Sequence, residues 1–201
     1  MDLKMHSQLL NRVVFLDRDG VINHDSPNYI KSWKEFEFLP RSLSALKLLK
    51  ENNFSVILIT NQSAVSRRLI TLQELDYIHH MLKQIVMGNG GYIKDIFYCP
   101  HGPEDNCYCR KPKPGLVIKA KEQYGIEIKN AYMVGDSARD IECSKKALCG
   151  YNILVKTGNG LSAEKMLYEK GCFLDYVAED LYDAAEWIIN NEGGTLWDNR
   201  R

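Results

Sequence analysis

The hydrophobic pattern of this 201-residue chain alternates between short apolar runs and longer amphipathic segments. Residues 13–17 and 55–60 are almost entirely apolar up to their last position, as expected of parallel strands that are covered on both faces. Between them, residues 42–52 carry a leucine at every third position from 43 to 49, which predicts one face of a helix. The order strand, helix, strand is typical of a parallel sheet joined by right-handed crossovers.

The same alternation continues along the rest of the chain. Thr71 and Glu74 have the spacing of a capping box, which predicts a helix that ends near residue 87, before a glycine-rich stretch. Later patterns predict strands and helices over residues 96–99, 115–124, 131–135, 137–148, 151–155, 176–177 and 181–190. We therefore expect a doubly wound, Rossmann-like three-layer α/β sandwich with a central parallel sheet.

The length of the intervals between these segments bears on domain organisation. None of the intervals accommodates a separate cap domain, so the predicted site is open, with the cysteine-containing loop over residues 99–109 and residues 23–33 as its walls. We expect one domain over residues 1–190 and a C-terminal tail over residues 191–201. The N-terminus has no sustained apolar stretch, and no run approaches the roughly 20 residues that a bilayer span needs. We expect neither a signal peptide nor a membrane contact.

Charge and cysteine content narrow the class of protein further. Lys plus Arg and Asp plus Glu both total 26, and this zero net charge argues against a general nucleic-acid binder. Without a secretory signal, the six cysteines fit a reducing compartment, so we expect a cytoplasmic protein with free thiols.

Chemically unusual residues follow the ends of the predicted strands. In open parallel sheets, ligands bind at the carboxyl ends of the strands. Carboxylates crowded at such an edge predict a magnesium ion, and cations and a hydroxyl beside them predict a phosphate. The residues concerned are Asp17, Asp19, Thr60, Asn61, Arg110, Lys111 and Asp136.

These residue types suggest a phosphoryl-transfer site. Asp17 stands at the strand end and is the candidate nucleophile, because a carboxylate that attacks phosphorus divides one displacement into two easier ones. Asp19 is close enough to act as general acid and base, and Gly20 lets the backbone turn beneath the pair. Asp140 has the S-x-x-D spacing of a helix cap with Ser137, and we favour that interpretation over metal ligation.

Four stretches then reveal a family resemblance. DRDGVIN, ITNQS, CRKP and VGDSARD are similar, in order, to the four motifs of the haloacid-dehalogenase-like phosphatase superfamily, across residues 13–140. The resemblance implies Asp17 as nucleophile and Asp19 as acid and base. It also implies Mg²⁺ held by Asp17, Asp136 and the backbone carbonyl of Asp19, with Thr60 and Lys111 on the phosphate. Asn61 and Arg110 are added as substrate-binding candidates.

A cluster of sulfur and imidazole ligands precedes the third motif. Cys99, His101, Cys107 and Cys109 form a Cys₃His set, which is typical of a closed, structural zinc site. A redox pair or idle thiols would leave His101 unexplained. Because Cys109 adjoins Arg110, we expect the zinc loop over residues 99–109 to hold the segment that presents the two cations.

The zinc loop followed by RKP resembles one branch of the superfamily, the D-glycero-D-manno-heptose 1,7-bisphosphate phosphatases, and also the histidinol-phosphate phosphatases. TNQS and CRKPKPG favour the heptose enzymes. This resemblance implies an Mg²⁺-dependent hydrolase that removes the C7 phosphate of a small sugar bisphosphate, in heptose synthesis for bacterial lipopolysaccharide. We expect the protein to be a monomer. The alternatives are a phosphatase for histidinol phosphate or another small ester, and a non-enzymatic zinc-loop scaffold, which would have no need of Asp17 and Asp19.

Overall fold

Six parallel strands form the centre of the computed structural model, which describes residues 10–193, without the side chains of the last two. The strand order is β3-β2-β1-β4-β5-β6, and each neighbouring pair is parallel. The strands are β1 (Val13–Leu16), β2 (Ser55–Asn61), β3 (Ile93–Cys99), β4 (Tyr132–Gly135), β5 (Tyr151–Val155) and β6 (Tyr176–Ala178).

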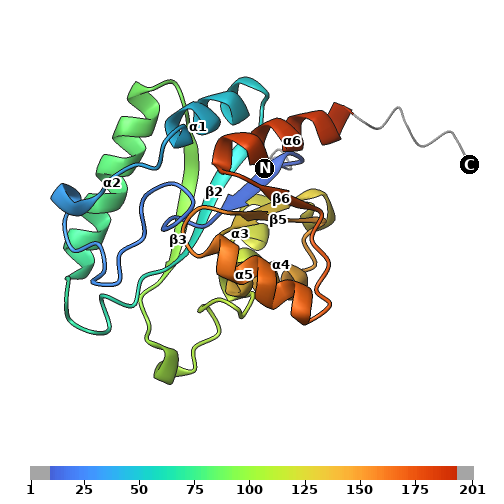
Figure 1. Cartoon of the computed structure of the whole chain (residues 1–201). Coiled ribbons are helices and arrows are strands. Elements are labelled where there is room, and N and C mark those ends of the chain that lie inside the picture. The colour runs from blue at the N-terminus through green and yellow to red at the C-terminus, as the bar shows by residue number, and fades with distance from the viewer. Residues whose placement is uncertain (1–9, 194–201) are drawn as a thin grey trace, which may run out of the picture.

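Six α-helices cover the two faces of this sheet (Figure 1). Helices α1, α2 and α6 share one apolar cluster with the sheet, and α3 and α4 share the cluster on the opposite face, where α5 packs against α4. Their bounds are α1 (Ser42–Glu51), α2 (Leu72–Gly88), α3 (Gly115–Tyr124), α4 (Ala138–Ala147), α5 (Gly160–Glu169) and α6 (Leu181–Gly193).

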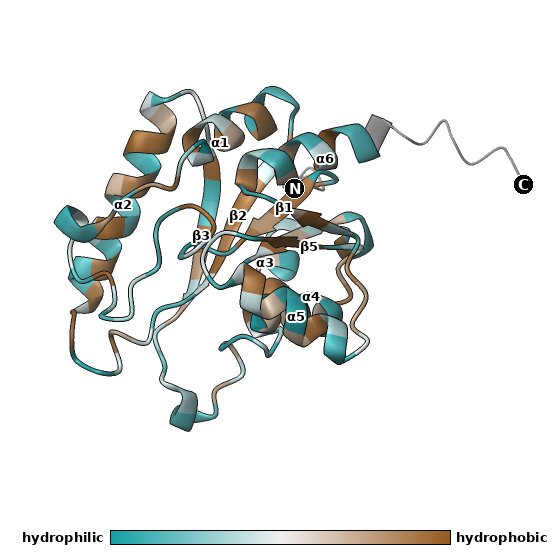
Figure 2. Cartoon of the chain, viewed as in Figure 1, coloured by the Kyte–Doolittle hydropathy of each residue, from teal (hydrophilic) through white to brown (hydrophobic). Residues whose placement is uncertain are grey.

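Strand β1 shows why the sheet is apolar on both faces. Val14 and Leu16 belong to the cluster beneath α1, α2 and α6, whereas Val13 and Phe15 belong to the cluster beneath α3 and α4. Successive side chains of a strand point to opposite faces, so a strand covered on both faces needs apolar residues at every position. The hydropathy of the chain follows this arrangement, since the central strands are mostly brown and the helices alternate between brown and teal (Figure 2).

The predicted fold class is confirmed, and two local differences are informative. Helix α5 was not predicted, because only its glycine start, Ala163 and Leu167 are buried, which gives a weak apolar pattern. Strand β3 begins three residues earlier than predicted, since it lies at the sheet edge and tolerates the half-buried polar residues Lys94 and Asp95.

The predicted C-terminal tail begins within helix α6. Residues 191–193 continue helix α6, and the remainder of the predicted tail, residues 194–201, lies outside the described residues, as do residues 1–9. Over residues 10–193, none of the helices has both the length and the apolar content that crossing a bilayer requires.

Candidate active site

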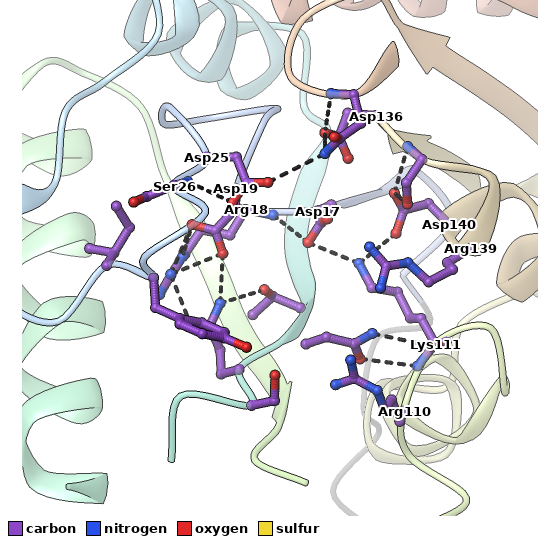
Figure 3. Close-up of a pocket in the computed structure, with 18 of the residues that line it drawn as sticks. Asp17, Arg18, Asp19, Asp25, Ser26, Arg110, Lys111, Asp136, Arg139 and Asp140 are labelled. Carbon is purple, nitrogen blue, oxygen red and sulfur yellow. Dashed lines mark hydrogen bonds and ion pairs between the residues drawn. The ribbon is translucent and has the colours of Figure 1, made fainter. Parts of the chain in front are cut away.

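A cavity of about 270 Å³ lies at the carboxyl ends of β1, β2 and β4 (Figure 3). Strand β1 is the point where the strand order reverses, since its neighbours β2 and β4 carry the chain in opposite directions across the sheet. This is where open α/β sheets bind ligands. The cavity is lined by all seven predicted site residues, Asp17, Asp19, Thr60, Asn61, Arg110, Lys111 and Asp136.

Lys111 is the buried cation of the site. Its side chain is only 3% exposed, and its ammonium lies 2.8 Å from Asp17 Oδ1 and 2.6 Å from Asp140 Oδ1. It also donates a 2.7 Å hydrogen bond to the Ile59 carbonyl. Burial alone would lower the pKa of Lys111, but the carboxylates of Asp140 and Asp17 outweigh burial and raise it. The lysine therefore stays charged beside the candidate nucleophile.

Asp17 is surrounded by other acids. Its Oδ1 also accepts a 2.7 Å hydrogen bond from the backbone of Arg18. Burial, followed by repulsion from Asp140, Asp136 and Asp19, raises the pKa of Asp17 to about 8, although Lys111 acts in the opposite direction. A divalent cation near this carboxylate would remove the repulsion and restore the ionised form that nucleophilic attack requires.

A group of three carboxylates offers oxygen ligands to such a cation. One oxygen each from Asp17, Asp136 and Asp140 lies within 4.8 Å of the others. Asp136 Oδ2 accepts 2.8 and 3.1 Å hydrogen bonds from the backbone and side chain of Asn159, while burial and then Asp140 raise the pKa of Asp136 to about 6. Hard carboxylate oxygens in this number suit Mg²⁺, so the residues fit the predicted ion.

Asp140 has two functions in the structure. Its Oδ2 accepts a 3.1 Å hydrogen bond from the backbone of Ser137 and a 2.6 Å bond from the Ser137 hydroxyl, which confirms the predicted helix cap at α4. Its other oxygen pairs with Lys111, which the sequence pattern did not indicate. The cap thus fixes the carboxylate that holds the lysine in place.

The Asp19 carboxylate is held away from the other acids by a dense set of donors. Arg18 donates to both oxygens at 2.9 to 3.2 Å, Asn23 to Oδ1 at 2.8 Å and Gln62 to Oδ2 at 2.8 Å. Burial favours the neutral form, but the Arg18 charge and these hydrogen bonds prevail and keep the pKa of Asp19 below its usual value. In this arrangement Asp19 is ionised and able to accept a proton.

Arg18, Gln62 and His79 complete this network, and sequence reasoning did not assign them. Arg18 is 1% exposed and lies 3.2 Å from His79 Nε2 on α2. Burial, then the Arg18 charge, lowers the pKa of His79 to about 3, so the ring is neutral and accepts a hydrogen bond from the guanidinium. No sequence signal links Arg18 to a histidine 61 positions away. Gln62, in contrast, lies within the TNQS motif and was visible there.

The polar side chains at the end of β2 contact their neighbours directly. The Asn61 amide accepts a 3.0 Å hydrogen bond from the Lys111 backbone and donates a 3.2 Å bond to its carbonyl, in addition to lining the cavity. Thr60 Oγ1 accepts a 2.9 Å bond from Gln62. Asn61 therefore fixes the segment that carries Lys111, and its predicted contact with substrate stays a prediction.

Gly20 satisfies a steric requirement of the site. Its φ of +82° lies in the left-handed region, and a Cβ at this position would overlap the Asp136 carboxylate. Glycine is therefore required at this turn both for its backbone conformation and for the close approach of Asp136.

The four predicted zinc ligands converge in the loop after β3. Sulfur–sulfur distances among Cys99, Cys107 and Cys109 are 3.2 to 3.5 Å, and His101 Nδ1 lies 3.2 Å from Cys109 and 3.6 Å from Cys99. Tetrahedral zinc with Zn–S bonds near 2.3 Å separates its sulfurs by roughly 3.8 Å. All six cysteines are free thiols, so this set is available to a metal and its geometry fits zinc.

The rim of the cavity combines predicted and unpredicted residues. Asp25, Ser26, Pro27, Tyr29 and Ile30 form the wall that was predicted from residues 23–33. The other predicted wall is wrong, since none of residues 99–109 lines the cavity. Arg110, held by a 3.0 Å hydrogen bond to the His101 carbonyl, links the cavity to this loop. Arg139 and Asn159 also line the cavity without having been predicted.

Comparison with known proteins gives a consistent result. Residues 108–184 match the HAD-hydrolase-like family model. The chain is 42% identical over 149 residues to the D-glycero-beta-D-manno-heptose-1,7-bisphosphate 7-phosphatase of Pseudomonas aeruginosa, covering 74% of this chain and 83% of that protein. It is 39% identical to the protein of the same name from Bordetella bronchiseptica, covering 89% and 98% respectively.

A solved structure extends this similarity to three dimensions. The D,D-heptose 1,7-bisphosphate phosphatase of Bordetella bronchiseptica, crystallised with magnesium and phosphate, matches this fold with a TM-score of 0.83 at 37% identity. The match covers 90% of this chain and 99% of that one.

Proposed function

Because this chain belongs to the D-glycero-D-manno-heptose-1,7-bisphosphate 7-phosphatase family of haloacid-dehalogenase-like hydrolases, we propose that it hydrolyses the C7 phosphate of that sugar bisphosphate. The observation that carries the proposal is the convergence of Asp17, Lys111 and Asp136 in one cavity at the strand-order switch. The family's product would enter heptose synthesis for bacterial surface polysaccharide.

The reaction divides into two displacements at phosphorus. In the first, an Asp17 oxygen bonds to phosphorus, the bond from phosphorus to the C7 oxygen breaks, and Asp19 passes to the leaving oxygen a proton that enters with the monoanionic phosphate ester. In the second, water attacks the aspartyl-phosphate, Asp19 takes the proton of that water, and the Asp17–phosphorus bond breaks to release phosphate. The Arg18, Asn23 and Gln62 donors hold Asp19 as the base of the second step.

The cations of the site balance the charge of the phosphate. Lys111 is buried against Asp17 and would contact the transferring phosphoryl oxygens, and Thr60 would offer a hydroxyl from β2. Mg²⁺ would be held by Asp17, Asp136 and the Asp19 carbonyl, with Asp140 beside them, and would neutralise charge on the phosphoryl group.

A comparison of substrates tests this function. We expect kcat/KM for D-glycero-β-D-manno-heptose 1,7-bisphosphate to exceed that for histidinol phosphate and for simple sugar phosphates by about 10²-fold or more. A substrate that lacks the hydroxyl or phosphate groups of the heptose leaves polar groups of the site without hydrogen-bond partners, and this lowers its kcat/KM. The α anomer is measured beside the β anomer. A higher kcat/KM for histidinol phosphate would make the alternative function correct, and turnover of none of these esters would favour a scaffold.

Metal analysis separates the two proposed metal sites. EDTA should abolish turnover and added Mg²⁺ restore it, whereas about one zinc per chain should survive mild chelation, since four protein ligands enclose it.

Cys107→Ser should lose the zinc and raise KM by about 5-fold or more through a loosened Arg110, with Cys172→Ser as the matched control. Zinc retained by Cys107→Ser, or absent from the native protein, would contradict the assignment.

A cytoplasmic monomer is proposed as the working form. The six free thiols are consistent with a reducing compartment.

A further inference from the structure

The cations that line the cavity differ in how they are neutralised. Four positively charged side chains lie on its walls, from Arg18, Arg110, Lys111 and Arg139. Arg18 pairs with Asp19, and Lys111 pairs with Asp17 and Asp140, so these two are already committed to acids of the site. The other two arginines have no acidic partner among residues 10–193.

Of Arg110 and Arg139, Arg139 makes fewer contacts within the protein. Arg110 donates to the His101 carbonyl, but Arg139 makes neither a hydrogen bond nor an ion pair within the described part of the chain. Arg139 lies in the first turn of α4, three residues after Asp136, and its side chain is exposed. A guanidinium that lines a cavity without any partner in the protein is available to a ligand, and its bidentate donors match a phosphate.

The size of the cavity determines which part of a substrate reaches this arginine. Its volume, about 270 Å³, falls below the roughly 300–1,000 Å³ of pockets that enclose a whole ligand. With the C7 phosphate at Asp17 and Lys111 on the floor, the C1 end of the sugar must therefore extend to the rim. Figure 3 shows Arg139 on the same side of the cavity as Arg110 and Lys111, with Asp25 and Ser26 on the opposite side.

From these observations, and resting on the proposed function, we propose that Arg139, beside Arg110, binds the second phosphate of the substrate at the rim and makes the enzyme selective for bisphosphates. Histidinol phosphate has no second phosphate, and its end remote from the ester is an imidazole. It therefore lacks the anionic group with which these guanidiniums would pair, and the rim favours the bisphosphate over it. Arg139 is thus a specificity-determining residue, whereas Lys111 and Asp17 act on the phosphate that is removed.

Paired substrates test this role. We expect Arg139→Ala to raise KM for heptose 1,7-bisphosphate by about 10-fold or more, the value of a charge-assisted hydrogen bond, with kcat within about 3-fold of wild type. KM for heptose 7-phosphate, which lacks the second phosphate, should change by less than about 2-fold. Arg139→Lys should recover part of the affinity. Lys145→Ala, which removes the same charge from the last turn of α4, is the matched control.

The possible outcomes are distinct. An equal rise in KM for both heptose phosphates would place Arg139 on the transferring phosphate, and no rise for the bisphosphate would remove it from binding; either result overturns the proposal. If wild-type protein hydrolyses other esters but not heptose bisphosphate, the proposed function fails by itself. The Arg139 proposal is then decided by fructose 1,6-bisphosphate and fructose 6-phosphate as competitive inhibitors, since only inhibition by the bisphosphate should weaken in Arg139→Ala.

Discussion

Asp17→Asn should lower kcat by at least about 10⁴-fold and leave the fold intact, because an amide cannot form the aspartyl-phosphate. The substitution preserves shape, and the Asn oxygen can still accept the hydrogen bonds from the Arg18 backbone and from Lys111. Steady-state kinetics with heptose 1,7-bisphosphate and Mg²⁺ measures the loss. Asp76→Asn, the same chemical change on the exposed surface of α2, is the control.

The same variant should gain stability in the absence of metal. Burial and neighbouring acids raise the pKa of Asp17 to about 8, so between about pH 4 and pH 8 the folded protein binds a proton that the unfolded chain releases. Stability of the metal-free wild type therefore falls as the pH rises through this range, and Asp17→Asn removes that loss. Thermal unfolding of the wild type and of Asp17→Asn in EDTA, at pH 5 and at pH 8, measures this difference in stability. Activity near wild type, or a variant less stable at pH 8, would exclude this account of Asp17.

Lys111→Met is expected to reduce both activity and stability. Removing the ammonium leaves the Asp140 carboxylate buried without its counter-ion, and loss of one partner from a buried pair costs about 3 kcal/mol. It also removes a cation from the transferring phosphate, so kcat/KM should fall by about 10²-fold or more. Denaturant unfolding and steady-state kinetics give the two quantities.

A double substitution separates the two effects of Lys111. In Lys111→Met with Asp140→Asn, one buried charge disappears together with the lysine, so part of the lost stability should return. Activity should not return, because the cation beside the phosphate is still missing. Lys121→Met, on the exposed face of α3, is the control. Recovery of activity by the double variant would show that Lys111 serves only to neutralise Asp140.

The sequence was most informative where function depends on residues that are close along the chain. Asp17 and Asp19 follow one strand, the Cys₃His ligands lie within eleven residues, and Ser137 and Asp140 share one helical turn. In each case local geometry decides which groups meet. Spacing alone therefore predicted that the two carboxylates lie at the carboxyl end of the strand, that the Cys₃His residues cluster in one loop, and that Asp140 caps the helix with Ser137. The weak pattern of α5 and the polar start of β3 show the limit, since both elements depend on neighbours for their burial.

The partners of buried charges depended on the tertiary structure. That Lys111 bridges Asp17 and Asp140, and that Arg18 contacts both Asp19 and His79, follows from strand order and from the helices packed against each face. By itself, the sequence determined the fold class and predicted the candidate nucleophile, the acid beside it and the Cys₃His set, because these follow from apolar periodicity and short spacings. Only the tertiary structure decided which cations are neutralised and that Arg139 is left without a partner at the rim, because ion pairing depends on distances between residues far apart in the chain.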